Sequence, residues 1–229
     1  MANASFERPG LPGDTAAACG RIGPGTVVLI VGPSGAGKDA LLHGVAEQLA
    51  HDRAFHFPRR QINRSSHAAE SHDVLSDQEL SCMNFSDACA LSWQAHGLTY
   101  AIPVEIDTIV REGACVVFNA SRTAIPSARQ RYANLKVVYV DAPRSLRALR
   151  LEARGRETAT EIGARLAREV TTFQSSAADV TIHNDGSLAD GIGSLLAALR
   201  SFLSPSHSTS EQARPTSRRR PKSADRPFE

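Results

Sequence analysis

The stretch Gly32-Pro-Ser-Gly-Ala-Gly-Lys38-Asp39 decides the fold. It directly follows the aliphatic run Val27–Val31, which is typical of a strand buried on both faces, and it leads into apolar residues at helical spacing from Leu41 to Leu49. Glycines let the backbone curl so that several N–H groups point at one anion, and the helix N-terminus adds partial positive charge. This order of strand, loop, lysine and helix predicts a phosphate-binding loop rather than a turn that merely caps a helix.

One position in this loop departs from the general pattern. Asp39 stands where a serine or threonine usually offers its hydroxyl to magnesium. A carboxylate is also a suitable ligand for a hard cation, either directly or through water. We therefore expect ATP and Mg²⁺ as cofactors, with Asp39 as a metal ligand. The residues expected to hold the nucleotide phosphates are Gly32, Pro33, Ser34, Gly35, Ala36, Gly37, Lys38 and Asp39.

The composition is that of a soluble α/β protein with one domain of ordinary size. The chain has 229 residues, of which 41% are hydrophobic and 22% are charged. Its longest aliphatic run is far too short to span a bilayer, and the first residues lack the apolar segment of a secretory signal. We therefore expect a cytoplasmic protein with no membrane partner.

The cysteines give no sign of a disulfide framework or a metal site. The chain has 4 of them, without a CxxC pair or any other spacing typical of metal ligands. Cys115 lies inside an apolar run, so we expect it to be a small core residue. The full set, which we expect to be buried or inert thiols, is Cys19, Cys82, Cys89 and Cys115.

The two ends of the chain differ in character from the part between them. Residues 1–25 are rich in Gly, Pro and Ala without periodicity, which predicts a flexible leader before a folded domain at 26–203. Residues 204–229 carry a net charge of +3 and the rest of the chain −1. We expect a disordered tail, with contact of Arg218–Arg220 to RNA or membrane phosphates as the alternative. Because the body is not cationic, we expect no nucleic-acid partner.

Between these ends, buried-type strands alternate with helical patterns. The strands expected after the first are Ala54–Phe57, Ala114–Phe118, Leu135–Val140 and Val180–Ile182. The helices expected are one opened by the capping box Ser76–Glu79, one from Pro103 to Gly113, one over Pro143–Arg154 that resumes near Ile162, and Leu188–Leu203. This alternation predicts an α/β fold with a central, mostly parallel sheet flanked by helices on both faces.

Arginines are frequent around Gly155, which interrupts the helix expected over Pro143–Arg154. Seven lie within 25 residues, and a solvated helix face accounts for some of them. Arginines on a closing loop neutralise charge on a transferring phosphoryl group, so we expect lid roles for Arg154 and Arg165. Arg156 fits either interpretation. The seven are Arg144, Arg147, Arg150, Arg154, Arg156, Arg165 and Arg168.

No motif in the sequence indicates a residue that would act as a general base. We find no Ser-His-Asp set and no pair of catalytic carboxylates. A phosphate acceptor is already an anionic nucleophile at neutral pH and needs no base. We therefore expect catalysis by positioning and electrostatics, supplied by Lys38, Arg154, Arg165 and magnesium.

Six segments besides the phosphate loop carry a family resemblance: Ala90–Leu98, Val104–Asp107, Asn119–Arg122, Arg154–Glu157, Glu161–Arg168 and Asn184–Leu188. Together with the loop they resemble the guanylate-kinase group of P-loop kinases and, within it, the ribose 1,5-bisphosphate phosphokinases. The resemblance covers most of the chain, from about Val27 to Leu203. It implies a guanylate-kinase-like P-loop NTPase fold with a mobile lid, and transfer from ATP to ribose 1,5-bisphosphate that yields 5-phosphoribosyl diphosphate in phosphonate breakdown.

The same resemblance assigns the acceptor side residue by residue. Ser92 stands where guanylate kinases place a glutamate that accepts hydrogen bonds from guanine, and a serine offers no carboxylate. His72 takes the place of a phosphate-binding tyrosine, and Arg64 matches one phosphate arginine, with His67 near the position of the other. Tyr100 matches a second phosphate-contacting tyrosine.

Alternatives remain open for several of these positions. His72 fits a surface residue as well as it fits a phosphate contact. Tyr100 fits an aromatic residue of the core nearly as well as it fits a phosphate contact. Asn119 replaces an aspartate that usually supports magnesium, so with Arg122 it is expected to hold ribose hydroxyls or the second phosphate. Trp93 is expected to be a packing residue.

Two rival functions remain. A guanylate-type nucleoside monophosphate kinase is the nearer, and the serine at 92 counts against it. A catalytically weak nucleotide-binding interaction domain is the other, and Lys38 with the lid arginines counts against that. The expected partner is a small phosphorylated sugar, and the oligomeric state stays open.

Overall fold

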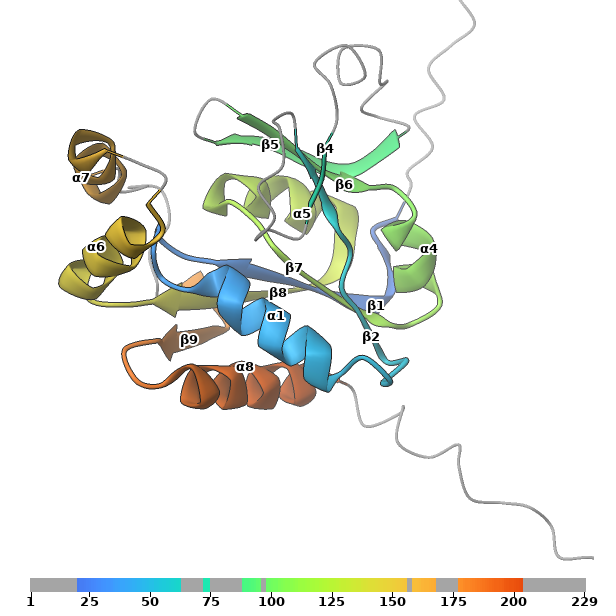
Figure 1. The fold of residues 1–229 in the computed structure, drawn as a ribbon. Coiled ribbons are helices and arrows are strands. Elements are labelled where there is room, and N and C mark those ends of the chain that lie inside the picture. Colours follow the sequence, from blue (N-terminus) through green and yellow to red (C-terminus); the bar gives the residue numbers. More distant parts are fainter. Residues whose placement is uncertain are drawn as a thin grey trace, which may run out of the picture.

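The fold is built on two β-sheets, and the phosphate loop follows the central strand of the larger one (Figure 1). The computed structural model describes residues 20–62, 72–74, 88–95, 98–155, 158–167 and 177–203. The larger sheet has five parallel strands in the order β2-β7-β1-β8-β9. Their bounds are Phe55–His56, Cys115–Asn119, Ile22–Val31, Tyr132–Asp141 and Val180–His183, so every strand expected from the sequence is confirmed.

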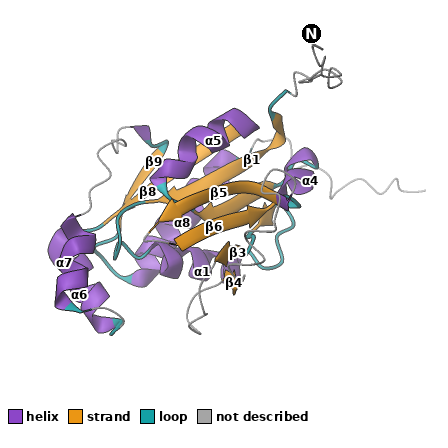
Figure 2. Ribbon diagram, turned by 90° about the horizontal axis from the view of Figure 1, so that it is seen from above, coloured by secondary structure: helices purple, strands orange, loops and turns teal. Residues whose placement is uncertain are grey.

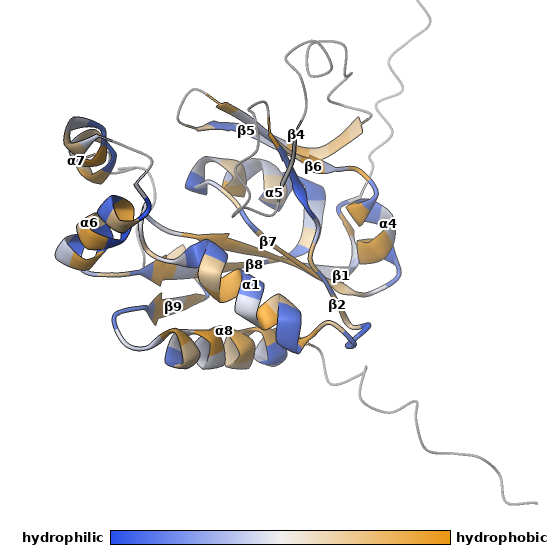
Figure 3. Cartoon of the chain, viewed as in Figure 1, coloured by the Kyte–Doolittle hydropathy of each residue, from blue (hydrophilic) through white to orange (hydrophobic). Residues whose placement is uncertain are grey.

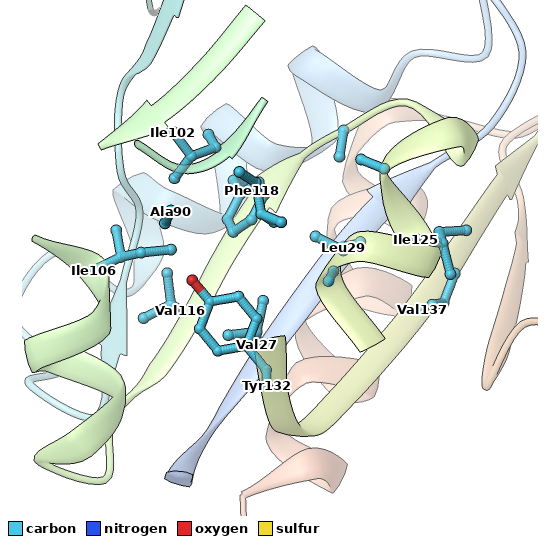
Figure 4. Close-up of a cluster of buried hydrophobic side chains, with 14 of the residues drawn as sticks. Val27, Leu29, Ala90, Ile102, Ile106, Val116, Phe118, Ile125, Tyr132 and Val137 are labelled. Atoms are coloured by element: carbon cyan, nitrogen blue, oxygen red, sulfur yellow. The ribbon is translucent and has the colours of Figure 1, made fainter. Parts of the chain in front are cut away.

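The alternation of side chains along β1 divides the hydrophobic core in two, because successive residues of a strand point to opposite faces. Val28 and Ile30 pack beneath α1 (Lys38–Gln48) and α8 (Leu188–Phe202). Val27, Leu29 and Val31 face the second core, which includes residues of α4 (Ile106–Arg111) and α5 (Ile125–Arg131). Figure 4 shows this second cluster, with Tyr132 and Phe118 among its large side chains. Both faces are covered, which explains the unbroken aliphatic sequence of the strand.

A second sheet lies over this face, and the sequence analysis did not predict it (Figure 2). Its four strands run in the order β4-β3-β6-β5, with β3 antiparallel to β6 and β6 antiparallel to β5. Leu91, Trp93 and Ile102 of this sheet belong to the second core. One face of the central sheet is therefore covered partly by strands rather than by helices alone. The bounds are His72–Val74 for β4, Arg60–Ile62 for β3, Leu98–Pro103 for β6 and Cys89–Ala95 for β5.

Several element boundaries differ from the sequence-based expectation, among them the start of β8, which lies at Tyr132 rather than Leu135. Pro103 does not open a helix; it is the last residue of β6, and α4 begins only at Ile106. A proline is tolerated at the first turn of a helix but equally at the end of a strand, so the residue alone did not discriminate. β1 begins at Ile22 rather than Val27, with an irregular register between Ile22 and Thr26. The helix expected at Ser76–Glu79 lies outside the described residues.

The arginine-rich segment forms two short helices that pack on each other, α6 (Arg144–Ala153) and α7 (Ala159–Ala167). Leu151, Ile162 and Leu166 make a small core of their own, separate from the two main clusters. In Figure 3 these helices mix hydrophilic and hydrophobic colours, whereas the inner strands are mostly hydrophobic. The lid elements thus share little of the main core. The predicted helix, its break and its resumption are confirmed.

A partly buried ion pair lies at the end of the central sheet away from the phosphate loop. Asp107 of α4 is 3% exposed, and its carboxylate accepts hydrogen bonds from Arg131 and from the Tyr132 hydroxyl, the latter at 2.8 Å.

The cysteine predictions hold where they can be checked: Cys89 and Cys115 are free and buried, and burial raises the pKa of Cys115 to about 12. Cys19 and Cys82 lie outside the described residues. None of the helices in the described part of the chain is long and apolar enough to cross a membrane.

Candidate active site

The phosphate loop runs from the carboxyl end of β1 to the first residue of α1. Gly35 and Gly37 have φ values of +80° and +92°, a region that side chains rarely adopt. Space is also closed at both positions: a Cβ on Gly35 would meet the carbonyl oxygen of Arg147, and one on Gly37 would meet the side-chain amide of Asn184. The glycines are therefore required by backbone angle and by close packing, and the loop has the curled form that the sequence predicted.

Neighbouring elements hold the loop in this form. The Asn184 amide, 4% exposed, donates to the carbonyl oxygen of Ala36 at 2.8 Å. Arg150 of α6 donates to the same carbonyl at 3.4 Å, and Arg165 of α7 donates to the Ser34 hydroxyl at 3.3 Å. Both lid helices therefore touch the loop. Arg150 had been counted only as one arginine of the cluster, and its spacing from Arg147 and Arg154 on one helix face was the available signal.

Lys38 is folded back onto the loop that carries it. Its Nζ donates to the carbonyl oxygens of Gly32 and Pro33, each at 2.9 Å. Burial, and after it the positive charges of Arg60, Arg122 and Arg154, lower the pKa of Lys38 to about 8, although Asp39 opposes the shift. Several cations thus converge near one ammonium group. Such a site favours ligands that carry several negative charges.

Asp39 supplies the negative charge in this cluster. Its carboxylate accepts a hydrogen bond from the Asn119 amide at 2.7 Å and one from Arg60 at 3.2 Å. Burial alone would raise the pKa of Asp39, but Arg60, Lys38 and the Asn119 hydrogen bond outweigh it and lower that pKa. The group is therefore ionised at neutral pH. A carboxylate has about four lone-pair positions, so oxygen remains for a hard cation, and Asp39 fits the role of a magnesium ligand.

Arg60 is the site residue that the sequence analysis missed. It lies in β3, and its guanidinium contacts Asp39 and also lies over the Tyr100 ring, 5.7 Å from the ring centroid. Tyr100 in turn stacks on Trp93, with centroids 5.6 Å apart and planes at 2°. The stack connects the smaller sheet to the phosphate loop. The only sequence signal was a pair of arginines shortly after the second expected strand.

The structure brings some of the expected acceptor residues together and separates others. Asn119, 5% exposed, and Arg122 lie beside the phosphate loop, and Tyr100 joins them through Arg60. Ser92 pairs with Ala101 whereas Tyr100 pairs with Trp93, so Ser92 and Tyr100 point to opposite faces of their hairpin. Ser92 is exposed there and lines a small hollow.

The remaining expected residues are described only in part. Arg64, His67, Arg156 and Arg168 lie outside the described residues, and His72 is described only as the first backbone position of β4. Arg154 is exposed at the end of α6, close enough to Lys38 to lower its pKa. Among the described residues, no group of His, Cys, Asp and Glu forms a metal site. The described site is therefore one carboxylate surrounded by cations.

Comparison with known proteins identifies the family. A family model described as Zeta toxin matches residues 17–182. Ribose 1,5-bisphosphate phosphokinase of Bradyrhizobium diazoefficiens is 46% identical over 73% of this chain and 84% of its own length, and that of Pseudofrankia inefficax is 43% identical over 77% and 91%. A guanylate kinase structure from Anaplasma phagocytophilum superposes with a TM-score of 0.57 over 80% of this chain and 88% of its own, at 14% identity, which confirms the guanylate-kinase-like fold. The chain therefore belongs to the family that the Zeta toxin model describes and, more specifically, to the ribose 1,5-bisphosphate phosphokinases.

Proposed function

We propose that this chain transfers the γ-phosphoryl group of ATP to the anomeric phosphate of ribose 1,5-bisphosphate. An oxygen of that phosphate attacks the γ-phosphorus, the bond from the γ-phosphorus to the β–γ bridging oxygen breaks, and ADP leaves. The products are ADP and 5-phosphoribosyl diphosphate. The acceptor oxygen is ionised at neutral pH, so no proton has to be removed by the enzyme.

The observation that carries this proposal is the charge of the site. The positive charges of Arg60, Arg122 and Arg154 act on Lys38, and those of Arg60, Lys38 and Arg154 act on Asp39. Among the described residues of this cluster, Asp39 is the one carboxylate. That carboxylate already accepts hydrogen bonds from Arg60 and Asn119. The described cluster therefore offers strong recognition of phosphate and no spare acidic acceptor for a nucleobase edge. A doubly phosphorylated sugar without a base fits this chemistry.

Each residue has a distinct part in the transfer. The loop backbone from Gly32 to Asp39 orients the ATP phosphates, and Lys38 leaves its loop carbonyls to bind the β- and γ-phosphates. Arg165 and Arg154 approach from the lid and stabilise charge that develops on the transferring group. Asp39 would hold magnesium, which when bound neutralises charge on the β- and γ-oxygens.

A guanylate-type nucleoside monophosphate kinase is the alternative, and the shared fold is what speaks for it. At 14% identity the guanylate kinase structure carries the fold and no substrate. The curated relatives, in contrast, are named for ribose 1,5-bisphosphate and match most of the chain. Their names therefore favour the sugar over the nucleotide as acceptor.

Product analysis tests the proposal. The enzyme is incubated with ATP, magnesium and ribose 1,5-bisphosphate, and the products are followed by ³¹P NMR with Lys38→Ala as the control. We expect the signals of ADP and of a sugar diphosphate to rise together in the wild type only. ADP formation without a new diphosphate on the sugar would overturn the proposal.

A further inference from the structure

Arg60 joins the two halves of the site, and neither the phosphate-loop motif nor the lid explains its presence. Its side chain is 16% exposed, although β3 comprises only the three residues Arg60–Ile62. β3 pairs with β6 so that Ile62 lies opposite Tyr100, and Arg60, two residues earlier, lies on the same face of the sheet. The sheet register therefore places this guanidinium on the side of the phosphate loop.

Two contacts fix the orientation of the guanidinium. Its central carbon lies over the Tyr100 ring, 5.7 Å from the ring centroid, and one terminal nitrogen donates to Asp39 at 3.2 Å. A guanidinium has five N–H donors, so the ring contact and the hydrogen bond to Asp39 leave further donors on the group. Asp39 also accepts a hydrogen bond from the Asn119 amide at 2.7 Å, so it has a second partner besides Arg60. Arg60 can therefore turn its edge to an incoming anion without leaving Asp39 unpartnered.

The position of Arg60 also selects which anion it meets. It lies close enough to Lys38 to act on it electrostatically, and Lys38 is the residue that meets the γ-phosphate. In an in-line transfer the acceptor phosphate must lie directly beside the γ-phosphate. A cation between the phosphate loop and β6 is therefore next to the reacting phosphate of the acceptor rather than to its distant end.

We propose, resting on the proposed function, that Arg60 binds the acceptor phosphate that receives the γ-phosphoryl group. The Tyr100 ring contacts the guanidinium, and the hydrogen bond to Asp39 positions it before the acceptor binds. This adds to the acceptor site a residue from the smaller sheet, separate from the loop and lid residues already described.

The test compares Arg60→Ala and Arg60→Lys with the wild type and with a matched control, Arg111→Ala. Arg111 is exposed on α4, which packs near the start of β1, whereas the phosphate loop follows its end. KM for ATP, KM for the acceptor and kcat are measured, together with calorimetric binding of the acceptor alone. Arg60→Ala should weaken acceptor binding and raise its KM about 10- to 100-fold, the usual range for a charge-assisted hydrogen bond. KM for ATP should change less than about threefold, Arg60→Lys should recover part of the loss, and Arg111→Ala should match the wild type.

Two results would overturn the inference. The first is an unchanged affinity for the acceptor in Arg60→Ala. The second is a rise in KM for ATP alone, which would show that Arg60 only positions Asp39. If Arg60→Ala does not fold, the split between the two KM values in Arg60→Lys still decides. The wild type is first assayed with ribose 1,5-bisphosphate, ribose 5-phosphate and GMP, and the acceptor it uses best enters the comparison. Preference for GMP would overturn the proposed function, while the Arg60 comparison would still be decided on that acceptor.

Discussion

The phosphate loop and the acceptor side of this site are built in opposite ways. The loop is one run of eight consecutive residues. It follows β1, whose residues Val27–Val31 are fully buried, and its last residues begin α1. The proposed acceptor side takes Arg60, Tyr100 and Asn119 from three strands, and the hydrogen bond from Asn119 to Asp39 spans 80 positions of the sequence. The residues proposed to bind the nucleotide are therefore encoded locally, whereas those proposed to bind the acceptor are brought together by the packing of two sheets.

The largest expected effect lies in the local half. Lys38→Ala removes the ammonium group that strengthens its contact with the γ-phosphate in the transition state, and we expect kcat to fall at least ~100-fold. Lys136→Ala is the control, since Lys136 forms a partly exposed ion pair with Asp179 away from the loop. Steady-state kinetics and melting temperatures are measured for both. Turnover near the wild-type value in a folded Lys38→Ala protein would contradict the role.

Two glycine substitutions test whether ATP binding depends on the backbone geometry of the loop or only on the general flexibility that glycine gives. Gly37→Ala forces a side chain into a left-handed conformation, at a cost of about 1–2 kcal/mol, and against the Asn184 amide. We expect KM for ATP to rise about tenfold. Gly163→Ala in α7 meets open space and should stabilise that helix by about 0.5–1 kcal/mol without raising KM. Equal KM values in the two variants would show that the loop tolerates a side chain.

What local sequence patterns predict, and what they do not, follows the same division. The loop, the five parallel strands and the lid helices were predicted because each has a continuous local pattern. β3 has three residues, too few for any period, and its value lies in its register with β6. Arg60 could not be placed without that register. Pro103 misled because proline suits both a helix start and a strand end. The hydrogen bond from Asn119 to Asp39 joins residues 80 positions apart, so no local pattern could show it.

The pH dependence of ATP binding probes the electrostatics that connect the two halves. Since burial and nearby arginines lower the pKa of Lys38 to about 8, the ATP-free enzyme loses this charge as pH rises through 8. ATP favours the charged form, so its affinity should fall about tenfold between pH 7 and pH 9. Lys38→Arg keeps its charge over this range and should lose the dependence. Calorimetry across pH measures both, and a flat wild-type profile would mean that Lys38 titrates normally.

The smallest expected effect is at Ser92. Its side chain is exposed on the face of the β5–β6 hairpin opposite Tyr100. Ser92→Glu should therefore change kcat/KM for the acceptor less than about threefold, a size typical of surface charges. A loss comparable to that of Arg60→Ala would show that this face also meets the acceptor.

The acceptor selectivity of the wild-type enzyme tests the central claim most directly. If the site recognises charge and not a nucleobase, kcat/KM for ribose 1,5-bisphosphate should exceed that for GMP by at least ~100-fold, because a base edge would find no matching polar partner. Both values are measured with ATP and magnesium from the rate of ADP release. A higher kcat/KM for GMP would contradict the account and assign the chain to nucleoside monophosphate phosphorylation.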